Sequence, residues 1–344
     1  MILRRADFSL SDEQRALRDS FATLLARECP GERVRKAEPL GFDERLWAKL
    51  VDLGVVRMGV PEADGGDGAG LVELALVAEQ VGRALAPVPF VEAVVAARAL
   101  ARCGPAGSSW LRATLEATTL VTVAVHSGAP QLVPAGAVAE AVVGLLGDDL
   151  VVAAADPPPP LVPTQGSVPL AWWDLADPAL SRYELAPGPA ALEVAARAVR
   201  EWKLLMAAAQ VGIADGALGL AVDYARDRLA FGAPIATYQG VSHPLVDSHI
   251  AVVGARRLVW KAAWLADHEP DVEPHLIPMA FTHACRTGVQ AATVAVHTQG
   301  GLGVTLESDV QLFFRRARGW AAVAGGPTAA LGVIADALYG TARH

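Results

Sequence analysis

The chain has 344 residues, of which 53 % are hydrophobic and 19 % are charged, and its formal net charge at pH 7 is -8. This composition can bury a large core in one to three domains, and it excludes an intrinsically disordered protein. The acidic balance argues against a nucleic-acid partner.

The first region, residues 1–117, is predicted to be helical. Ser11 and Gln14 have the spacing of a capping box, and apolar residues follow them at helical spacing. The glycine-rich stretch Pro61–Gly70 predicts a turn between helices. Further helices are expected over Asp43–Asp52, Leu71–Leu85, Val91–Arg102 and Ser109–Ala117.

The hydrophobic period changes across residues 118–188. The runs LVTVAV, AVVGLL and LVVAAA are short, rich in valine and separated by Gly, Asp or Pro, so they predict strands of a small β-domain. Ala155–Pro163 contains four consecutive prolines. Because proline cannot donate to a sheet, this segment is expected to be an extended loop.

Residues 189–344 return to long helical patterns. The expected helices are Ala190–Arg228, His243–His268, Pro274–Thr298 and Pro327–Tyr339. The order of the three regions predicts an α+β protein with an N-terminal helical domain, a small middle β-domain and a C-terminal helical bundle.

Several patterns bear on location and on metal binding. The three cysteines are far apart, and they predict buried thiols in a reducing cytoplasm. The first residues turn polar at once, and apolar runs are interrupted before the roughly 20 residues of a membrane span, so we expect a soluble, cytoplasmic protein without a signal peptide. The eight histidines form no HxH or HxxxH pair, and no metal site is predicted.

The stretch RDRLAFGAPIATYQ ends the longest helical pattern with cations, a ring and a turn. An arginine fork at Arg228 suits a phosphate, the ring of Phe231 can stack on adenine, and the amide of Gln239 can hold a base edge or a ribose hydroxyl. Together they predict a grip on the ADP part of a nucleotide cofactor. For Arg226, a simple match to the helix dipole is an equally good explanation.

This stretch, extended to YARDRLAFGAPIATYQGVSHPLVD, resembles the signature of the acyl-CoA dehydrogenase family. HTQGGLGVTLESDVQLFFRRAR and VPEADGGDGAGLVELALVAEQVGRALAPVPF resemble two further family motifs, so the similarity spans nearly the whole chain. It implies an N-terminal helical domain, a middle β-domain and a C-terminal four-helix bundle. It also implies FAD as the cofactor, bound across a subunit interface, and hence at least a dimer.

The resemblance assigns cofactor-binding residues as well. It implies that Arg228, Phe231 and Gln239 hold the adenine and pyrophosphate of FAD, while the glycine-rich motif of a neighbouring subunit approaches the same cofactor. His297, Gly300 and Gly301 belong to that motif. His297 stands where the family usually has glutamine.

Family members remove hydrogen from Cα and Cβ of an acyl-CoA thioester: a carboxylate takes the α-proton and flavin N5 takes the β-hydride. The usual glutamate is missing here, and Gly325 stands in its place. A minority of members carry the base on the first helix of the C-terminal bundle, at a position that matches Trp202. The neighbouring Glu201 is therefore the candidate catalytic base, and the alternative is a solvated helix residue. Lys203 falls where the family usually has an arginine that supports the active site.

Three hypotheses remain open from the sequence. The first is an FAD-dependent acyl-CoA dehydrogenase-like enzyme, either a homo-oligomer or a heteromer with a related subunit that supplies the glutamate. The second is a non-catalytic subunit that completes the flavin site of a partner dehydrogenase. The third is flavin chemistry on an acyl intermediate without α-proton abstraction. The β-domain lacks the T-E-P-x-x-G-S-D and G-x-K-x-[WYF]-I-T segments of the family, so the ring end of the flavin is poorly specified.

Overall fold

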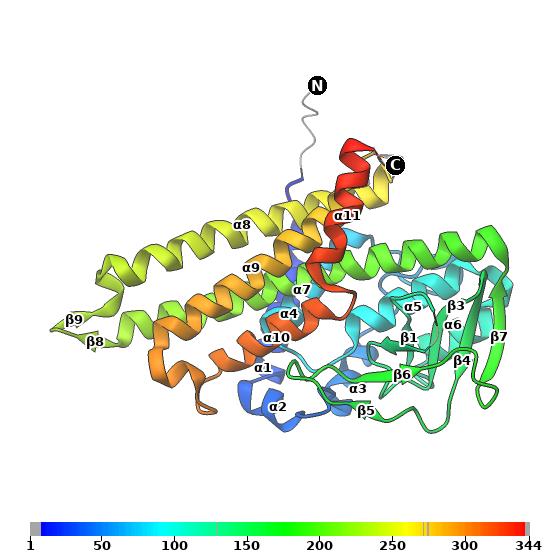
Figure 1. Cartoon of the computed structure of the whole chain (residues 1–344), viewed down its shortest axis with the longest axis horizontal. Coiled ribbons are helices and arrows are strands. Elements are labelled where there is room, and N and C mark those ends of the chain that lie inside the picture. Colours follow the sequence, from blue (N-terminus) through cyan, green and yellow to red (C-terminus); the bar gives the residue numbers. More distant parts are fainter. Residues whose placement is uncertain (1–7, 129, 271, 274, 341–344) are drawn as a thin grey trace.

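The computed structural model describes residues 8–128, 130–270, 272–273 and 275–340 (Figure 1). Helices come first along the chain, two small sheets follow, and long helices complete it. The predicted α+β class, with a helical N-terminal region, a sheet region and a helical bundle, is confirmed. Residues 1–7, on which the expected absence of a signal peptide partly rests, lie outside the described residues.

The N-terminal helices begin at the predicted capping box. Ser11 Oγ accepts the amide of Gln14 at 3.2 Å, and the amide of Ser11 donates to Gln14 Oε1 at 3.0 Å. A short 3₁₀ turn, η1 (Glu62–Asp64), lies in the glycine-rich segment. The helices are α1 (Asp12–Glu28), α2 (Gly31–Lys36), α3 (Glu44–Asp52), α4 (Leu71–Arg83), α5 (Phe90–Arg102) and α6 (Ser108–Leu115). Helices α4 and α5 are buried over most of their length.

Two sheets make up the middle region. One has the strand order β1-β3-β4-β7, with β1 parallel to β3 and the other pairs antiparallel, and the other has the order β2-β6-β5. The strands are β1 (Val121–Val123), β2 (Gln131–Val133), β3 (Ala141–Leu146), β4 (Asp149–Ala154), β5 (Leu161–Val162), β6 (Leu170–Trp173) and β7 (Ser181–Ala186). Strand β5 corrects the expected loop, because Leu161 and Val162 follow the last of the four prolines and keep their own amides.

Helices α7 (Gly188–Asp227), α8 (Gln239–His268), α9 (Leu276–Gln299), α10 (Val310–Ala322) and α11 (Gly326–Tyr339) form the C-terminal bundle. Helix α8 begins four residues before the predicted start at His243 and carries Pro244 inside it. Because proline is favoured in the first turn of a helix, Pro244 indicated a start next to it and not four residues earlier. Helix α10 was not predicted, because the charged and glycine residues of RRARGW interrupt the spacing of apolar residues that indicates a helix.

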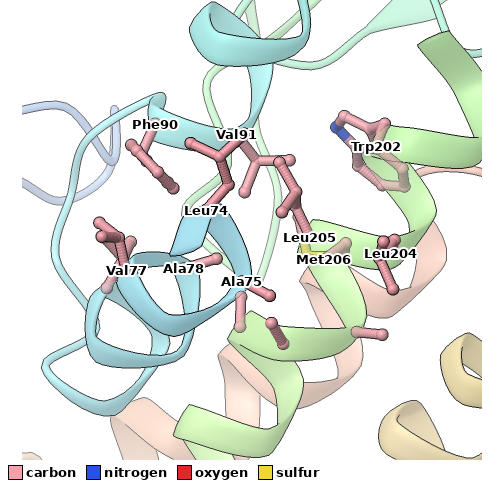
Figure 2. Packing of buried hydrophobic residues seen from close by; sticks show 14 of the residues in the cluster. Leu74, Ala75, Val77, Ala78, Phe90, Val91, Trp202, Leu204, Leu205 and Met206 are labelled. Carbon is pink, nitrogen blue, oxygen red and sulfur yellow. The ribbon is translucent and has the colours of Figure 1, made fainter. Parts of the chain in front are cut away.

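The deepest part of the core lies where α4 and α5 pack on α7 (Figure 2). Leu74 and Ala78 of α4 face Leu205 and Met206 of α7 in this layer. At Gly212, an added Cβ would overlap the carbonyl of Glu79, so α4 and α7 cross with their backbones in contact.

Helix α7 corrects the expectation that every apolar run is too short for a membrane span. It is long and apolar enough by length and composition, but 72 % of its most apolar window is buried inside the protein. The protein core therefore accounts for its apolar surface.

Candidate active site

The residues predicted to hold the nucleotide, Arg228, Phe231 and Gln239, lie in and beside a hairpin between α7 and α8. Strands β8 (Leu229–Ala230) and β9 (Ala233–Pro234) pair, and the amide of Ile235 donates to the carbonyl of Arg228 at 2.8 Å. Phe231 and Gly232 occupy the tip with φ angles of 52° and 84°, as in a type I′ turn. Phe231 is 99 % exposed. A bulky side chain with positive φ and nearly full exposure contributes little to packing within the fold, which points to a role outside the chain.

The two polar residues of this predicted nucleotide site have no side-chain partner in the described part of the chain. Arg228 and Gln239 are exposed, and within the described part of the chain neither side chain makes a hydrogen bond or an ion pair. Arg228 caps α7 only through its backbone amide, which donates to the carbonyl of Tyr224 at 2.9 Å. The guanidinium and the amide can therefore bind a ligand without giving up an internal contact.

The glycine-rich motif lies at the end of α9, toward the same end of the bundle as the hairpin (Figure 1). His297 is exposed, and Gly300 starts the 3₁₀ turn η4 (Gly300–Val304) with φ 62°. An added Cβ would meet nothing at Gly300 or Gly301, so this backbone is open to an approaching group. Gln299 is not free, because its Oε1 accepts the hydroxyl of Ser308 at 2.6 Å.

Large apolar side chains gather around these two motifs. We call this set the end patch, and its members are more than half exposed: Leu229, Phe231, Val246, Ile250, Val304 and Leu306. Several large apolar side chains exposed near these two motifs indicate a protein interface or a ligand groove.

Two family models cover most of the chain. The acyl-CoA dehydrogenase N-terminal domain matches residues 11–122, and the acyl-CoA dehydrogenase C-terminal domain matches residues 192–339. The chain belongs to the acyl-CoA dehydrogenase family. Membership places it among oxidoreductases of lipid metabolism.

Individual relatives in this family match the chain over nearly their full length. Acyl-CoA dehydrogenase IpdE2 of Mycolicibacterium smegmatis is 30 % identical, with 92 % of this chain and 96 % of the relative covered. Acyl-CoA dehydrogenase FadE27 of Mycobacterium tuberculosis is also 30 % identical, with 97 % and 99 % covered. The solved ChsE4-ChsE5 complex of Mycobacterium tuberculosis matches at a TM-score of 0.83 and 28 % identity, covering 97 % of this chain and 99 % of that chain. The Tcur3481-Tcur3483 steroid ACAD variant matches at 0.84 and 26 % identity, covering 95 % and 98 %.

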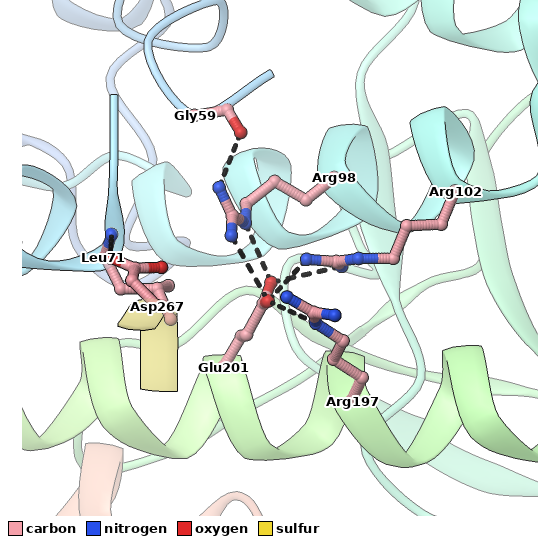
Figure 3. Close-up of polar contacts among 7 residues, drawn as sticks. All are labelled: Gly59, Leu71, Arg98, Arg102, Arg197, Glu201 and Asp267. Atoms are coloured by element: carbon pink, nitrogen blue, oxygen red, sulfur yellow. Dashed lines mark hydrogen bonds and ion pairs between the residues drawn. The ribbon is translucent and has the colours of Figure 1, made fainter. Parts of the chain in front are cut away.

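Glu201, the candidate base predicted from the sequence, lies at the centre of an arginine cluster (Figure 3). Arg98 donates to its carboxylate from Nε at 2.8 Å and from Nη2 at 3.3 Å, Arg102 donates from both terminal nitrogens, and Arg197 donates from Nε at 3.2 Å. Arg98 also donates to the carbonyl of Gly59 at 2.6 Å. The cluster ties α5 to α7.

The alternative that Glu201 is solvated is wrong, because the residue is 2 % exposed. Burial alone would raise the pKa of Glu201, but the charges and hydrogen bonds of Arg98 and Arg102 outweigh it and hold the pKa below the usual value. A carboxylate with a lowered pKa is a weaker base, and its lone pairs are occupied. Its role as catalytic base stays a prediction, and this environment favours a structural role.

A further buried carboxyl, Glu92 of α5, was not predicted from the sequence. It lines a narrow cavity next to Met206 of α7 and Val323, the latter lying two residues before Gly325. Gly325 itself has φ 79° at the start of α11, a conformation that favours glycine. A lone acid in the apolar run FVEAVVAA was the signal that could have identified Glu92.

A larger cavity lies on the sheet side of α7, between β1, β3, β4, α9 and α11. Its volume is about 560 Å³, and its walls are mostly Val, Ala and Leu. Lys203 and Arg200 line it one helical turn apart, and no acidic residue lies among the described lining residues. Burial lowers the pKa of Lys203, and no ion pair or hydrogen bond of its amino group occurs within the described chain. The cavity therefore suits an apolar ligand that carries negative charge.

The space between the sheet region and α10 is closed at one point. Trp320 Nε1 donates to the carbonyl of Gly166 at 3.2 Å, and an added Cβ at Gly166 would lie 2.7 Å from Cα of Gly319. The loop before β6 thus rests directly on α10.

Proposed function

We propose that the chain is a subunit of an FAD-dependent acyl-CoA dehydrogenase that acts on the α,β-bond of an acyl-CoA thioester in a soluble, cytoplasmic assembly. The hairpin carries this proposal, since Arg228, Phe231 and Gln239 are all exposed and, among the described residues, have no side-chain partner other than Tyr238, whose ring meets the edge of Phe231. In the assembly, the end patch is covered by a second copy or by a related chain.

The free groups of the hairpin fit the ADP half of FAD. Arg228 offers a guanidinium fork to the pyrophosphate, Phe231 offers a ring face to adenine, and Gln239 offers an amide to the base or the ribose. His297 and the open backbone of Gly300 and Gly301 supply donors to the same cofactor from a neighbouring subunit. When bound, FAD supplies the two-electron oxidant for the dehydrogenation.

The cavity with Lys203 and Arg200 fits the acyl-CoA itself. An acyl-CoA combines an apolar acyl chain with an anionic, phosphorylated carrier. The cavity likewise combines apolar walls with two cations, Lys203 and Arg200. Lys203 and Arg200 bind the anionic part, while the Val and Ala walls hold the apolar part.

The alternative function is a non-catalytic subunit that completes the flavin site of a partner dehydrogenase. Two observations favour it: Gly325 stands where the usual base belongs, and the contact between Gly166 and Gly319 closes the gap between the sheet region and α10. The ChsE4-ChsE5 relative is a complex of two chains, which makes a heteromer the partner arrangement to test first.

Absorption spectra and native mass spectra of the chain, purified alone and with a co-expressed paralogue, test both functions. A yellow assembly that contains FAD and bleaches on addition of an acyl-CoA supports the dehydrogenase. A yellow assembly that bleaches only when the paralogue has its glutamate supports the non-catalytic subunit. A folded, colourless assembly that refuses added FAD contradicts both.

A further inference from the structure

A cleft that neither proposed ligand uses lies between α1, α4 and α8, with Asp215 of α7 in its wall. Its volume is about 440 Å³, which is within the range of small-molecule sites. By the rise of an α-helix, Arg257 of this cleft lies about 27 Å along α8 from Gln239, so the cleft is separate from the hairpin. It also shares no described lining residue with the cavity that contains Lys203.

The charged side chains of the cleft leave one arginine over. The charged residues among its described lining are Arg18, Asp19, Glu79, Arg83, Asp215, Arg256 and Arg257. All three carboxylates are ion-paired with arginines, at N–O distances of 2.8 to 3.3 Å. Arg257 is exposed, and its side chain makes no hydrogen bond or ion pair within the described chain. Four guanidinium groups against three carboxylates leave one positive charge, and the unpaired residue carries it.

Two polar atoms of residues that line the same cleft are buried without a partner. Gln80 of α4 is 3 % exposed, and no donor within the described chain reaches its Oε1. The Nε1 of Trp260 on α8 is also buried, and no acceptor in that part of the chain reaches it. Buried polar groups in folded proteins are nearly always hydrogen-bonded, and an unmatched one costs stability. An unmatched acceptor and an unmatched donor at one cleft therefore indicate a ligand that satisfies both.

These three side chains specify the chemistry of that ligand. The guanidinium of Arg257 and the N–H of Trp260 are donors, and an anionic oxygen of a carboxylate or a phosphate suits both. Oε1 of Gln80 is an acceptor and needs a donor, which a hydroxyl group supplies. An organic anion without a hydroxyl would leave Gln80 unmatched, and a neutral polyol would leave Arg257 without a counter-charge.

We propose that this cleft binds a small organic anion that also carries a hydroxyl group. Its carboxylate or phosphate binds Arg257 and Trp260, and its hydroxyl donates to Gln80. The ligand contacts α4 and α8 at once, so its binding stabilises the packing of these two helices. This site goes beyond the proposed function, because it depends on neither FAD nor acyl-CoA.

The first experiment titrates the full-length chain with sn-glycerol 3-phosphate and with D-glycerate, in a calorimeter. Glycerol, which lacks the charge, and propionate, which lacks the hydroxyls, are the matched control compounds. At least one hydroxylated anion should bind with a Kd about 10-fold or more below those of both controls, and the tighter of the two identifies the anionic group. The indole N–H signal of Trp260, assigned in nitrogen-15 spectra by its loss in Trp260→Phe, should shift on binding.

Variants then separate the three contacts. Arg257→Gln should raise the Kd about 10-fold or more, whereas Arg286→Gln, at another exposed arginine without an ion pair in the described chain, should change it by less than about twofold. Gln80→Met removes the acceptor for the hydroxyl, so D-glycerate should then bind no better than propionate. The melting temperature of ligand-free Gln80→Met should not fall, because the replaced oxygen has no partner within the described chain.

Three results would overturn the proposal. Equal affinity for all four compounds, or no binding of any, would mean that water alone serves Gln80 and Trp260. A hydroxylated anion that binds without moving the Trp260 signal would bind elsewhere. A lower melting temperature of ligand-free Gln80→Met would mean that the fold itself uses the amide. Each of these results leaves FAD binding by the hairpin, measured separately, as the test of the proposed function.

Discussion

The two halves of helix α7 make opposite use of their polar residues. In the first half, Glu201 is bound by three arginines, and Trp202 donates to Glu92. At the other end, Arg228 and Gln239 are exposed, and their side chains make no hydrogen bond or ion pair within the described chain, while the exposed ring of Phe231 makes an edge contact with Tyr238. A group that the fold needs is paired inside it, and a group that is ordered but unpaired is available to a ligand or partner. We therefore expect the first half of α7 to contribute to stability and its far end to bind a ligand or partner.

The arginine cluster gives the strongest test of this contrast. Glu201→Ala leaves Arg98 and Arg102 buried without a counter-charge, and we expect it to lower the free energy of unfolding by about 3–5 kcal/mol. Glu193→Ala, on an exposed face of the same helix, should change it by less than about 0.5 kcal/mol. Urea denaturation followed by circular dichroism measures both. Equal effects of the two substitutions would show that the cluster does not hold α5 to α7.

The hairpin should give the opposite result, loss of binding without loss of stability. Arg228→Ala removes charge-assisted hydrogen bonds worth about 1.5–3 kcal/mol, so we expect the Kd of the assembly for FAD to rise roughly 10- to 100-fold. The melting temperature of the cofactor-free chain should not change, because the Arg228 side chain makes no hydrogen bond or ion pair with the described residues. Arg226→Ala, at the same helix end, is the control and should alter the Kd by less than about threefold. A fall in melting temperature without a change in Kd would show that Arg228 stabilises the fold and does not bind FAD.

Features that depend on neighbouring residues in the chain could be predicted from the sequence. Local signals sufficed for the capping box at Ser11, for the long helices and for the hairpin residues, because each depends on neighbours in the chain. The sequence placed Arg228, Phe231 and Gln239 at the bend between two long helices, and they lie there in the structure, while their role in cofactor binding stays a prediction.

The interior of the site could not be predicted in this way. Glu201 acquires its arginines from α5, about 100 residues earlier in the chain, and Glu92 acquires Trp202 across a similar separation. The spacing of apolar residues along the chain carries no information about contacts between side chains so far apart in the sequence. The sequence therefore indicated a carboxylate one residue from the expected place on α7, but not that its lone pairs are occupied by arginines.

Glycines on α7 provide a smaller test along the same helix. Gly212 packs against the backbone of α4, and Gly212→Ala should destabilise the protein by about 1–3 kcal/mol because neither backbone can move away cheaply. Gly219 has open space where a Cβ would stand, and Gly219→Ala should stabilise the protein by about 0.5–1 kcal/mol by favouring the helix. Thermal unfolding of the two variants should thus shift in opposite directions. Shifts of the same sign would contradict the close crossing of α4 and α7.

The pH dependence of stability tests the state of Glu92 without any ligand. Its pKa is raised in the folded protein, so the folded state retains a proton that the unfolded chain releases above about pH 4.3. Stability from this group is therefore complete at low pH and is lost as pH rises toward the folded pKa. Glu92→Gln abolishes this loss, so the variant should match wild type near pH 4 and should become progressively more stable than wild type as pH rises to 8. Urea denaturation at several pH values measures the difference, and a difference that does not vary with pH would mean that the buried carboxyl of Glu92 titrates as it does in the unfolded chain.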